Sequence, residues 1–325
     1  MVLEVQTQHL YLNLLNKILI FFICIIFFLS AYIFSYLNIK KYYEKENLIN
    51  IYKGESINII VNLILTDENY INKKIYSYYL KLFNKYYDTI KFGEFKIDNK
   101  LSLFQITNII SKPSNVYREL TIIDGWQFYQ LDKLIKEIFN NSYSIPYTHI
   151  IADTYKYQSH NNFEEIYQLL INTKDNFFYK FKSHELLEQY SIDDIMVIAS
   201  LIEKEGKTEH DKRLISSVIF NRLDKNLKLE LDATTIFSIT KGKYKFNRKL
   251  TYRDLKIKDN YNTYFIRGLP PKPICYVSRK TIEILLENYK SAYLFYFFDE
   301  KKQRHVFSKT YKEHIKLLNE YRKNE

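Results

Sequence analysis

The chain is built around the stretch Ile195-Met196-Val197-Ile198-Ala199-Ser200-Leu201-Ile202-Glu203-Lys204-Glu205-Gly206. Its two glutamates follow a segment that is almost entirely apolar. Burial disfavours the charged form of a carboxyl group, so the pKa of a glutamate in this position should rise. A raised pKa lets a general acid hold its proton near neutral pH. The alternative is that Glu203 and Glu205 only mark the solvated end of a buried helix, because helix ends are often charged. Helical spacing does not show which of the two glutamates faces a cleft.

Helix signals surround this stretch. Ser191-Ile192-Asp193-Asp194 has the form of a capping box that opens the helix, and Gly206 follows its last turn. We expect residues 163–190 to be largely helical, and we expect a further helix over 211–226 because its apolar residues recur at helical spacing. Asp232 is expected to cap a short helix that begins at the next residue.

The segment from Tyr252 to Pro273 is rich in Asn, Thr, Tyr, Gly and Pro and has no regular pattern. A long irregular segment between ordered elements is usually functional or disordered, and its aromatic residues favour order. Beyond it, Tyr293–Phe298 and His305–Phe307 predict a hairpin, and Thr310 predicts the cap of a final helix.

Residues 48–125 predict a small α+β module. Its expected elements are a helix from Ile57 to Leu65 capped by Ser56, a helix over 74–87, a strand over 92–97, a helix from Ser102 to Ile110 and a strand over 116–123. A helix over 126–140 opens the remainder of the chain, residues 126–325. The fold class is therefore α+β.

Residues 18–37 form a run of twenty residues without a formal charge, which is long enough to cross a bilayer. They follow a short tail, residues 1–17. We expect a single membrane-spanning helix, with a cleaved signal peptide as the less favoured alternative. The lysines after the run, Lys40, Lys41 and Lys45, outnumber Lys17, and this charge signal alone would place the C-terminal body in the cytoplasm.

The 325 residues carry a formal net charge of +11, which suggests an acidic partner. No compact block of Lys and Arg accompanies a nucleic-acid motif, so we expect no nucleic-acid partner. The two cysteines, Cys24 and Cys275, have no neighbours at metal-ligand spacing, and the seven histidines are scattered. We therefore expect no metal and no cofactor.

Several remaining motifs carry the resemblance to a known family. They are Ile198–Glu205, Phe220-Asn221-Arg222-Leu223, Leu231-Asp232, Tyr261-Asn262-Thr263-Tyr264, Gly268–Ile274 and His305-Val306-Phe307. In order and spacing they resemble the YceG-like (MltG) endolytic murein transglycosylases. The resemblance covers nearly the whole chain, with a membrane helix, a LysM-like module and a catalytic domain.

The resemblance implies a lytic transglycosylase that cleaves the β-1,4 bond between N-acetylmuramic acid and N-acetylglucosamine in nascent glycan strands. One glutamate would act first as the acid and then as the base that closes a 1,6-anhydro ring. By the match of motifs we expect Glu203 in that role. The expected supporting or substrate-binding residues are Glu205, Asn221, Asp232, Tyr261, Asn262 and His305.

The resemblance also implies an inner-membrane protein whose catalytic body lies outside the cytoplasm, with peptidoglycan strands as substrate and cell-wall synthases (penicillin-binding proteins) as partners. Three motifs depart from the family pattern, at Ala233, at Val277-Ser278 and at Ile315. A membrane-anchored peptidoglycan-binding scaffold without activity, and a basic membrane protein that faces the cytoplasm and binds nucleic acid, are the alternatives.

Overall fold

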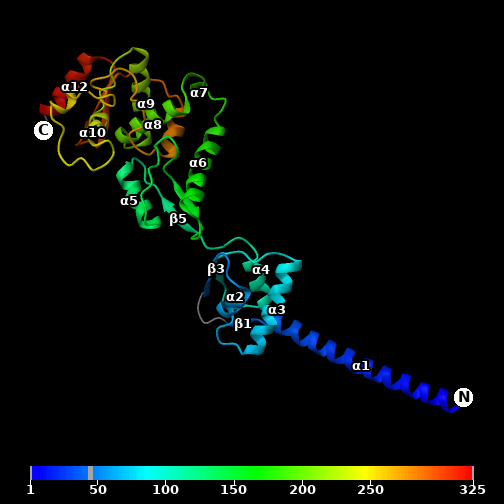
Figure 1. Cartoon of the computed structure of the whole chain (residues 1–325). Helices are drawn as coiled ribbons and strands as arrows, with labels where there is room; N and C mark the ends of the chain where they lie inside the picture. The colour runs from blue at the N-terminus through cyan, green and yellow to red at the C-terminus, as the bar shows by residue number, and fades with distance from the viewer. Residues whose placement is uncertain (1, 43–46, 324–325) are drawn as a thin grey trace. The chain divides into compact units, whose positions relative to one another are not determined.

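The computed structural model describes residues 2–42 and 47–323, and the chain divides into two compact units (Figure 1). The first unit comprises Met1–Arg118 with Tyr157–His160, and the second comprises Glu119–Lys156 with Asn161–Glu325. The sequence placed the boundary near residue 125, and that division into a LysM-like module and a catalytic domain stays a prediction.

The first unit contains four helices and four strands among its described residues. They are α1 (Val2–Asn38), β1 (Lys41–Tyr42), β2 (Asn47–Ile51), α2 (Ile57–Ile64), α3 (Tyr70–Tyr86), β3 (Gly93–Ile97), β4 (Lys100–Leu101) and α4 (Leu103–Ile110). Strands β2 and β3 are antiparallel, with Asn47 opposite Ile97, and β1 pairs with β4. Along the chain, helices α2 and α3 lie between β2 and β3, the two strands that pair.

Side-chain caps fix where these helices begin. Ser56 accepts a hydrogen bond from the Ile59 amide, and Ser102 forms a capping box with Gln105, so both predicted caps are confirmed. The helix predicted from residue 74 begins earlier, because Asn69 caps it through the Asn72 amide. Apolar residues from α2, α3 and α4 and from β2 and β3 form one core.

Helix α1 contains the predicted apolar run. Its segment Leu14–Asn38 has a mean hydropathy of 2.8 and is long and apolar enough to cross a membrane. Near its C-terminal end, Tyr36 and Leu37 are buried in the core of the first unit. The apolar helix is therefore joined to a folded module.

The second unit begins within β5 (Arg118–Thr121) and is mostly helical. Its further elements are α5 (Phe128–Phe139), β6 (Thr154–Tyr157), α6 (Phe163–Tyr179), α7 (Glu185–Gln189), α8 (Ile192–Glu205), α9 (Glu209–Asp224), α10 (Asp232–Thr240), a 3-10 turn η1 (Asp254–Lys256), α11 (Arg279–Leu286), β7 (Phe295–Asp299), β8 (Arg304–Ser308) and α12 (Tyr311–Lys323). The mixed α+β class predicted from the sequence is confirmed.

Helix α8 is the centre of the second unit. Every residue from Ile195 to Ile202 is buried, and α8 packs against α9, α10 and α11. The predicted capping box is present, since Ser191 accepts from the Asp194 amide and Asp194 accepts from the Ser191 amide. The core thus fixes the position at which the two glutamates leave the apolar segment.

One local expectation for the second unit is wrong. Asp232 is the first residue of α10, and Leu231 occupies the cap position, because the Asp232 carboxylate instead accepts a hydrogen bond from Tyr264. The expectation that residues 163–190 are largely helical is confirmed by α6 and α7, with a break between them. The predicted hairpin is confirmed as β7 and β8, with Phe295 opposite Ser308.

Candidate active site

Two carboxyl clusters form at the end of α8. Glu203 faces α9 and the first turn of α11, whereas Glu205 meets the start of α10 and strand β7. Residues two apart on a helix point in different directions, so the two glutamates meet different neighbours. The chemistry of each glutamate follows from those neighbours.

Glu203 is held in a buried ion pair. Its Oε1 accepts from the Lys212 ammonium at 2.5 Å, and its side chain is only 4% exposed. Its Oε2 accepts from the backbone amide of Ser278 at 3.1 Å and from the Ser278 hydroxyl at 2.8 Å. Lys212 also donates to the hydroxyl of Thr281 at 2.7 Å. The Glu203 carboxylate therefore connects α8, α9 and α11.

The pKa of Glu203 is lowered, so the expectation that it rises is wrong. Burial pushes the pKa upward, but the hydrogen bond and charge of Lys212 and the amide of Ser278 together outweigh it. A carboxylate with these partners is ionised at neutral pH. It lacks the proton that a general acid must donate.

Glu205 has the opposite environment. It is the last residue of α8 and is partly buried, and its Oε2 accepts from the Tyr296 hydroxyl at 3.3 Å. The neighbouring Asp232 carboxylate accepts from the Tyr264 hydroxyl at 2.8 Å. Two carboxyl groups and two phenols therefore meet where α8, α10, β7 and the irregular segment come together.

Burial raises the pKa of Glu205 to about 7, and the charge of Asp232 adds to the effect. The Tyr296 hydroxyl and the backbone amide of Ala233 oppose the rise without cancelling it. The C-terminal end of a helix carries partial negative charge, which also disfavours a carboxylate there. Glu205 therefore holds a proton in the pH range where the expected acid has lost it.

An open cleft of about 480 Å³ lies beside the Glu203 cluster. Its lining includes Asp124, Asp153, Ser278, Arg279 and Lys280. Burial raises the pKa of Asp124, and the charge of Glu203 raises it further. The lining combines apolar side chains with charged groups of both signs.

Two predicted site residues have their polar groups engaged by the protein itself. The Asn221 amide donates to the carbonyls of Ser291 and Tyr293. Asn262 is fully buried; it donates to the carbonyls of Leu255 and Ile257 and accepts from Thr235. Both asparagines hold loops in place through these hydrogen bonds.

His305 and Tyr261 occupy different positions. The His305 side chain is 5% exposed, and its Nδ1 lies 3.3 Å from the Asp211 carboxylate. Tyr261 packs on Phe237, with ring centroids 4.8 Å apart, and the Lys241 ammonium lies over its ring. Tyr261 is partly exposed and remains a candidate for stacking on a sugar, whereas His305 is buried beside a carboxylate.

Sequence reasoning did not single out Lys212, Tyr296 or Asp124. Lys212 lies nine residues after Glu203, beyond a turn, so neither helical spacing nor a motif links them. Tyr296 stands in a strand predicted only from its apolar pattern. Among residues 2–42 and 47–323 no group of three His, Cys, Asp or Glu side chains is placed to hold a metal ion.

Comparisons with known proteins identify the family. The YceG-like family matches residues 49–320. A relative from Bacillus subtilis (strain 168), named endolytic murein transglycosylase, is 26% identical over 309 residues, which are 84% of this chain and 84% of the relative. A relative of the same name from Streptococcus pneumoniae (strain D39) is 24% identical over 219 residues, covering 66% of this chain and 37% of that protein.

A solved structure has a similar fold. The crystal structure of a YceG-like protein from Listeria monocytogenes aligns with a TM-score of 0.53 and 24% identity, covering 83% of this chain and 98% of that one. The alignment therefore extends over most of both chains. The family match covers more than half of the sequence, and the chain belongs to the YceG-like family.

Proposed function

We propose that this chain is a peptidoglycan lytic transglycosylase that uses Glu205 as its general acid and then as its base. The relatives' name, endolytic murein transglycosylase, supports the reaction class. The observation that carries the assignment to Glu205 is its position beside the Asp232 carboxylate and under the Tyr296 hydroxyl, where burial and Asp232 raise its pKa to about 7. The substrate is the β-1,4 bond between N-acetylmuramic acid and N-acetylglucosamine.

In the first step the protonated Glu205 donates its proton to the glycosidic oxygen. The bond between that oxygen and C1 of the muramic acid breaks, and positive charge develops at C1. General acid catalysis by a positioned carboxyl group contributes about 10²- to 10⁴-fold to a rate. The Asp232 carboxylate beside Glu205 would also stabilise the developing positive charge.

In the second step the Glu205 carboxylate takes the proton of the C6 hydroxyl of the same sugar. The C6 oxygen attacks C1, which closes the 1,6-anhydro ring and restores the protonated acid. No water is consumed, in contrast with hydrolytic glycosidases, in which a second carboxylate serves a water molecule or a covalent intermediate. One carboxyl group with a pKa near neutrality is sufficient.

Tyr264 and Tyr296 position the two carboxyl groups. Tyr264 donates to Asp232, and Tyr296 donates to Glu205. Burial and the neighbouring carboxyl groups raise the pKa of both phenols, so they remain protonated donors at neutral pH. Glu203, which the motif match favoured, has a structural role in this proposal, because its ion pair with Lys212 keeps it ionised.

The apolar helix α1 supports a single-pass membrane anchor, with the second unit outside the cytoplasm where peptidoglycan is made. The flanking lysines alone favour the opposite orientation. The substrate's location is the stronger argument, and acidic glycan strands also suit a chain of net charge +11. Cell-wall synthases such as penicillin-binding proteins are the expected partners.

Two substitutions of the same kind test the proposal. Glu205→Gln and Glu203→Gln are each assayed on glycan strands, and the products are analysed by mass for 1,6-anhydro ends. We expect Glu205→Gln to lose at least about 10²-fold in rate, and Glu203→Gln to retain most activity per folded molecule. Activity in Glu205→Gln but none in folded Glu203→Gln would return the role to Glu203. Glycan binding without cleavage by the parent chain would instead identify an inactive scaffold.

A further inference from the structure

Helix α3 presents an unusual surface. Its sequence, YINKKIYSYYLKLFNKY, contains four lysines and no acidic residue. One side of the helix, with Tyr76 and Leu80, is fully buried. The opposite side is exposed and combines basic, aromatic and aliphatic side chains, and we name it the Lys–Tyr face: Tyr70, Ile71, Lys74, Tyr78, Lys81, Leu82 and Lys85.

The lysines of this face are paired with tyrosine rings. The Lys74 ammonium lies 4.8 Å from the ring centroid of Tyr70, and the Lys81 ammonium lies 5.5 Å from that of Tyr78. Tyr78 is 63% exposed, and Leu82 is 56% exposed. Lysine and tyrosine side chains each combine an apolar stem or ring with a polar tip, and such side chains suit a membrane interface.

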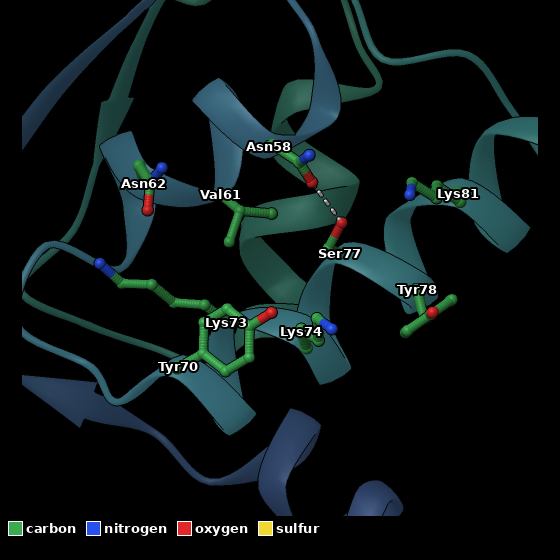
Figure 2. A pocket seen from close by; sticks show the side chains of 9 residues that line it. All are labelled: Asn58, Val61, Asn62, Tyr70, Lys73, Lys74, Ser77, Tyr78 and Lys81. Atoms are coloured by element: carbon green, nitrogen blue, oxygen red, sulfur yellow. Dashed lines mark hydrogen bonds between the residues drawn. The ribbon is translucent and has the colours of Figure 1, made fainter.

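A groove between α2 and α3 adjoins this face (Figure 2). It has a volume of about 300 Å³, and its lining holds three lysines and no carboxylate, the other residues being neutral: Asn58, Val61, Asn62, Tyr70, Lys73, Lys74, Ser77, Tyr78 and Lys81. Asn58 accepts from Ser77 across it. Three ammonium groups without a lining carboxylate favour an anionic ligand.

The first turn of α3 is tied to the end of the apolar helix. Lys41, three residues after α1, donates to the Tyr36 hydroxyl and forms an ion pair with Glu68. Glu68 in turn accepts from Asn72 in the first turn of α3 at 2.6 Å. If α1 crosses a bilayer, this link holds α3 at the headgroup layer, which is roughly 5–7 Å deep on each side.

We propose that the Lys–Tyr face lies on the membrane surface and that the groove beside it receives the phosphate of an anionic lipid headgroup. This inference rests on the membrane anchoring proposed above and is independent of the assignment of Glu205. The exposed Ile71 and Leu82 match the boundary of the hydrocarbon layer, and this favours a lipid over a soluble glycan as the source of the negative charge. Anionic headgroups attract lysines that lie within a Debye length of the membrane surface.

The experiment uses the full chain in vesicles of phosphatidylcholine, with or without phosphatidylglycerol, some carrying brominated acyl chains. Tyr78→Trp reports contact through quenching, and the parent supplies the signal of Trp126, the single tryptophan of the sequence. We expect the introduced indole to be quenched, more strongly with the anionic lipid. Lys73→Glu/Lys74→Glu/Lys81→Glu should reduce the quenching at least about threefold. The matched control, Lys243→Glu/Lys245→Glu/Lys249→Glu, changes the net charge by the same amount on the second unit. It should leave the quenching of the introduced indole unchanged.

Two results would overturn the inference. The first applies to a chain that resists alkaline extraction and so retains α1 in the bilayer. In such a chain, an introduced indole that stays unquenched would overturn the inference, and so would quenching that persists in Lys73→Glu/Lys74→Glu/Lys81→Glu. The other is a response of the Tyr78→Trp variant to soluble peptidoglycan fragments but not to lipid, which would make the groove a glycan site. Release of the chain by alkaline extraction would overturn the anchor itself, and loss of anhydro products would overturn only the proposed reaction.

Discussion

The ammonium of Lys212 reaches the carboxylate of Glu203 past Gly206, the residue that caps the C-terminal end of α8. A Cβ atom at Gly206 would lie 2.5 Å from Cγ of Lys212. The glycine has a φ of −82°, which any residue adopts, so space for the lysine is the feature that requires it. The end of α8 is thus shaped by an ion pair.

Lys212→Met is predicted to destabilise the second unit by about 3–5 kcal/mol, because it leaves Glu203 as an uncompensated buried charge. Unfolding of the full chain in detergent, followed by the fluorescence of Trp126, measures the change. The matched double variant Glu203→Gln/Lys212→Met removes the charge as well and should recover part of the loss. A single variant as stable as the parent would show that the pair contributes nothing.

Glu203 should also make stability depend on pH. Its folded-state pKa lies below the usual value of 4.5, so its ionised form stabilises the fold above that pH. This stability is lost as the pH falls below about 4.5 and through the folded-state pKa. We therefore expect the stability difference between the parent and Glu203→Gln to shrink in that window. A difference that stays constant from about pH 7 to about pH 3 would contradict the lowered pKa.

Gly206→Ala should cost about 1–3 kcal/mol, because the added methyl group overlaps Lys212 and approaches the Ile202 carbonyl at 3.2 Å. The same unfolding experiment gives the value. Removing the lysine side chain beyond Cβ should make room, so Gly206→Ala/Lys212→Ala is expected to cost less than the sum of its parts. Strict additivity would mean that the two positions do not compete for the same space.

Helix α8 and the β7–β8 hairpin were predictable because their sequence signals are local. The capping box at Ser191 and the apolar run to Ile202 lie within one helix, and alternation and turn residues mark the β7–β8 hairpin in the same way. The partners of the two glutamates are not local. Lys212, Asp232 and Tyr296 come from three other elements, and only the fold determines which glutamate each one meets.

The assignment of roles to the glutamates shows the same limit. The motif match contained both residues and chose Glu203, although desolvation acts on each of them. At Glu203 the ammonium of Lys212 outweighs the rise in pKa that desolvation causes, whereas at Glu205 the charge of Asp232 adds to that rise. The same holds for Asn262, because the carbonyls of Leu255 and Ile257 to which its side chain donates could not be identified from the sequence.

The raised pKa of Glu205 predicts a pH profile for the proposed reaction. A general acid must be protonated in the free enzyme, so kcat/KM should fall as the pH rises through about 7. Asp232→Asn removes the neighbouring charge and should lower the pKa of Glu205, which moves the falling limb to lower pH and reduces activity at about pH 7. The profile is measured from the rate of anhydro-product formation.

Glu203→Gln is the matched control for this profile. It also replaces one carboxylate of α8 by an amide, but the largest shifts in the pKa of Glu205 come from burial and from groups other than Glu203. Its falling limb should therefore stay at about pH 7. A limb that does not move in Asp232→Asn, or one that moves in Glu203→Gln alone, would show that another group carries the proton. Because these outcomes concern the position of the limb, they separate a lost proton donor from a variant that is merely less stable.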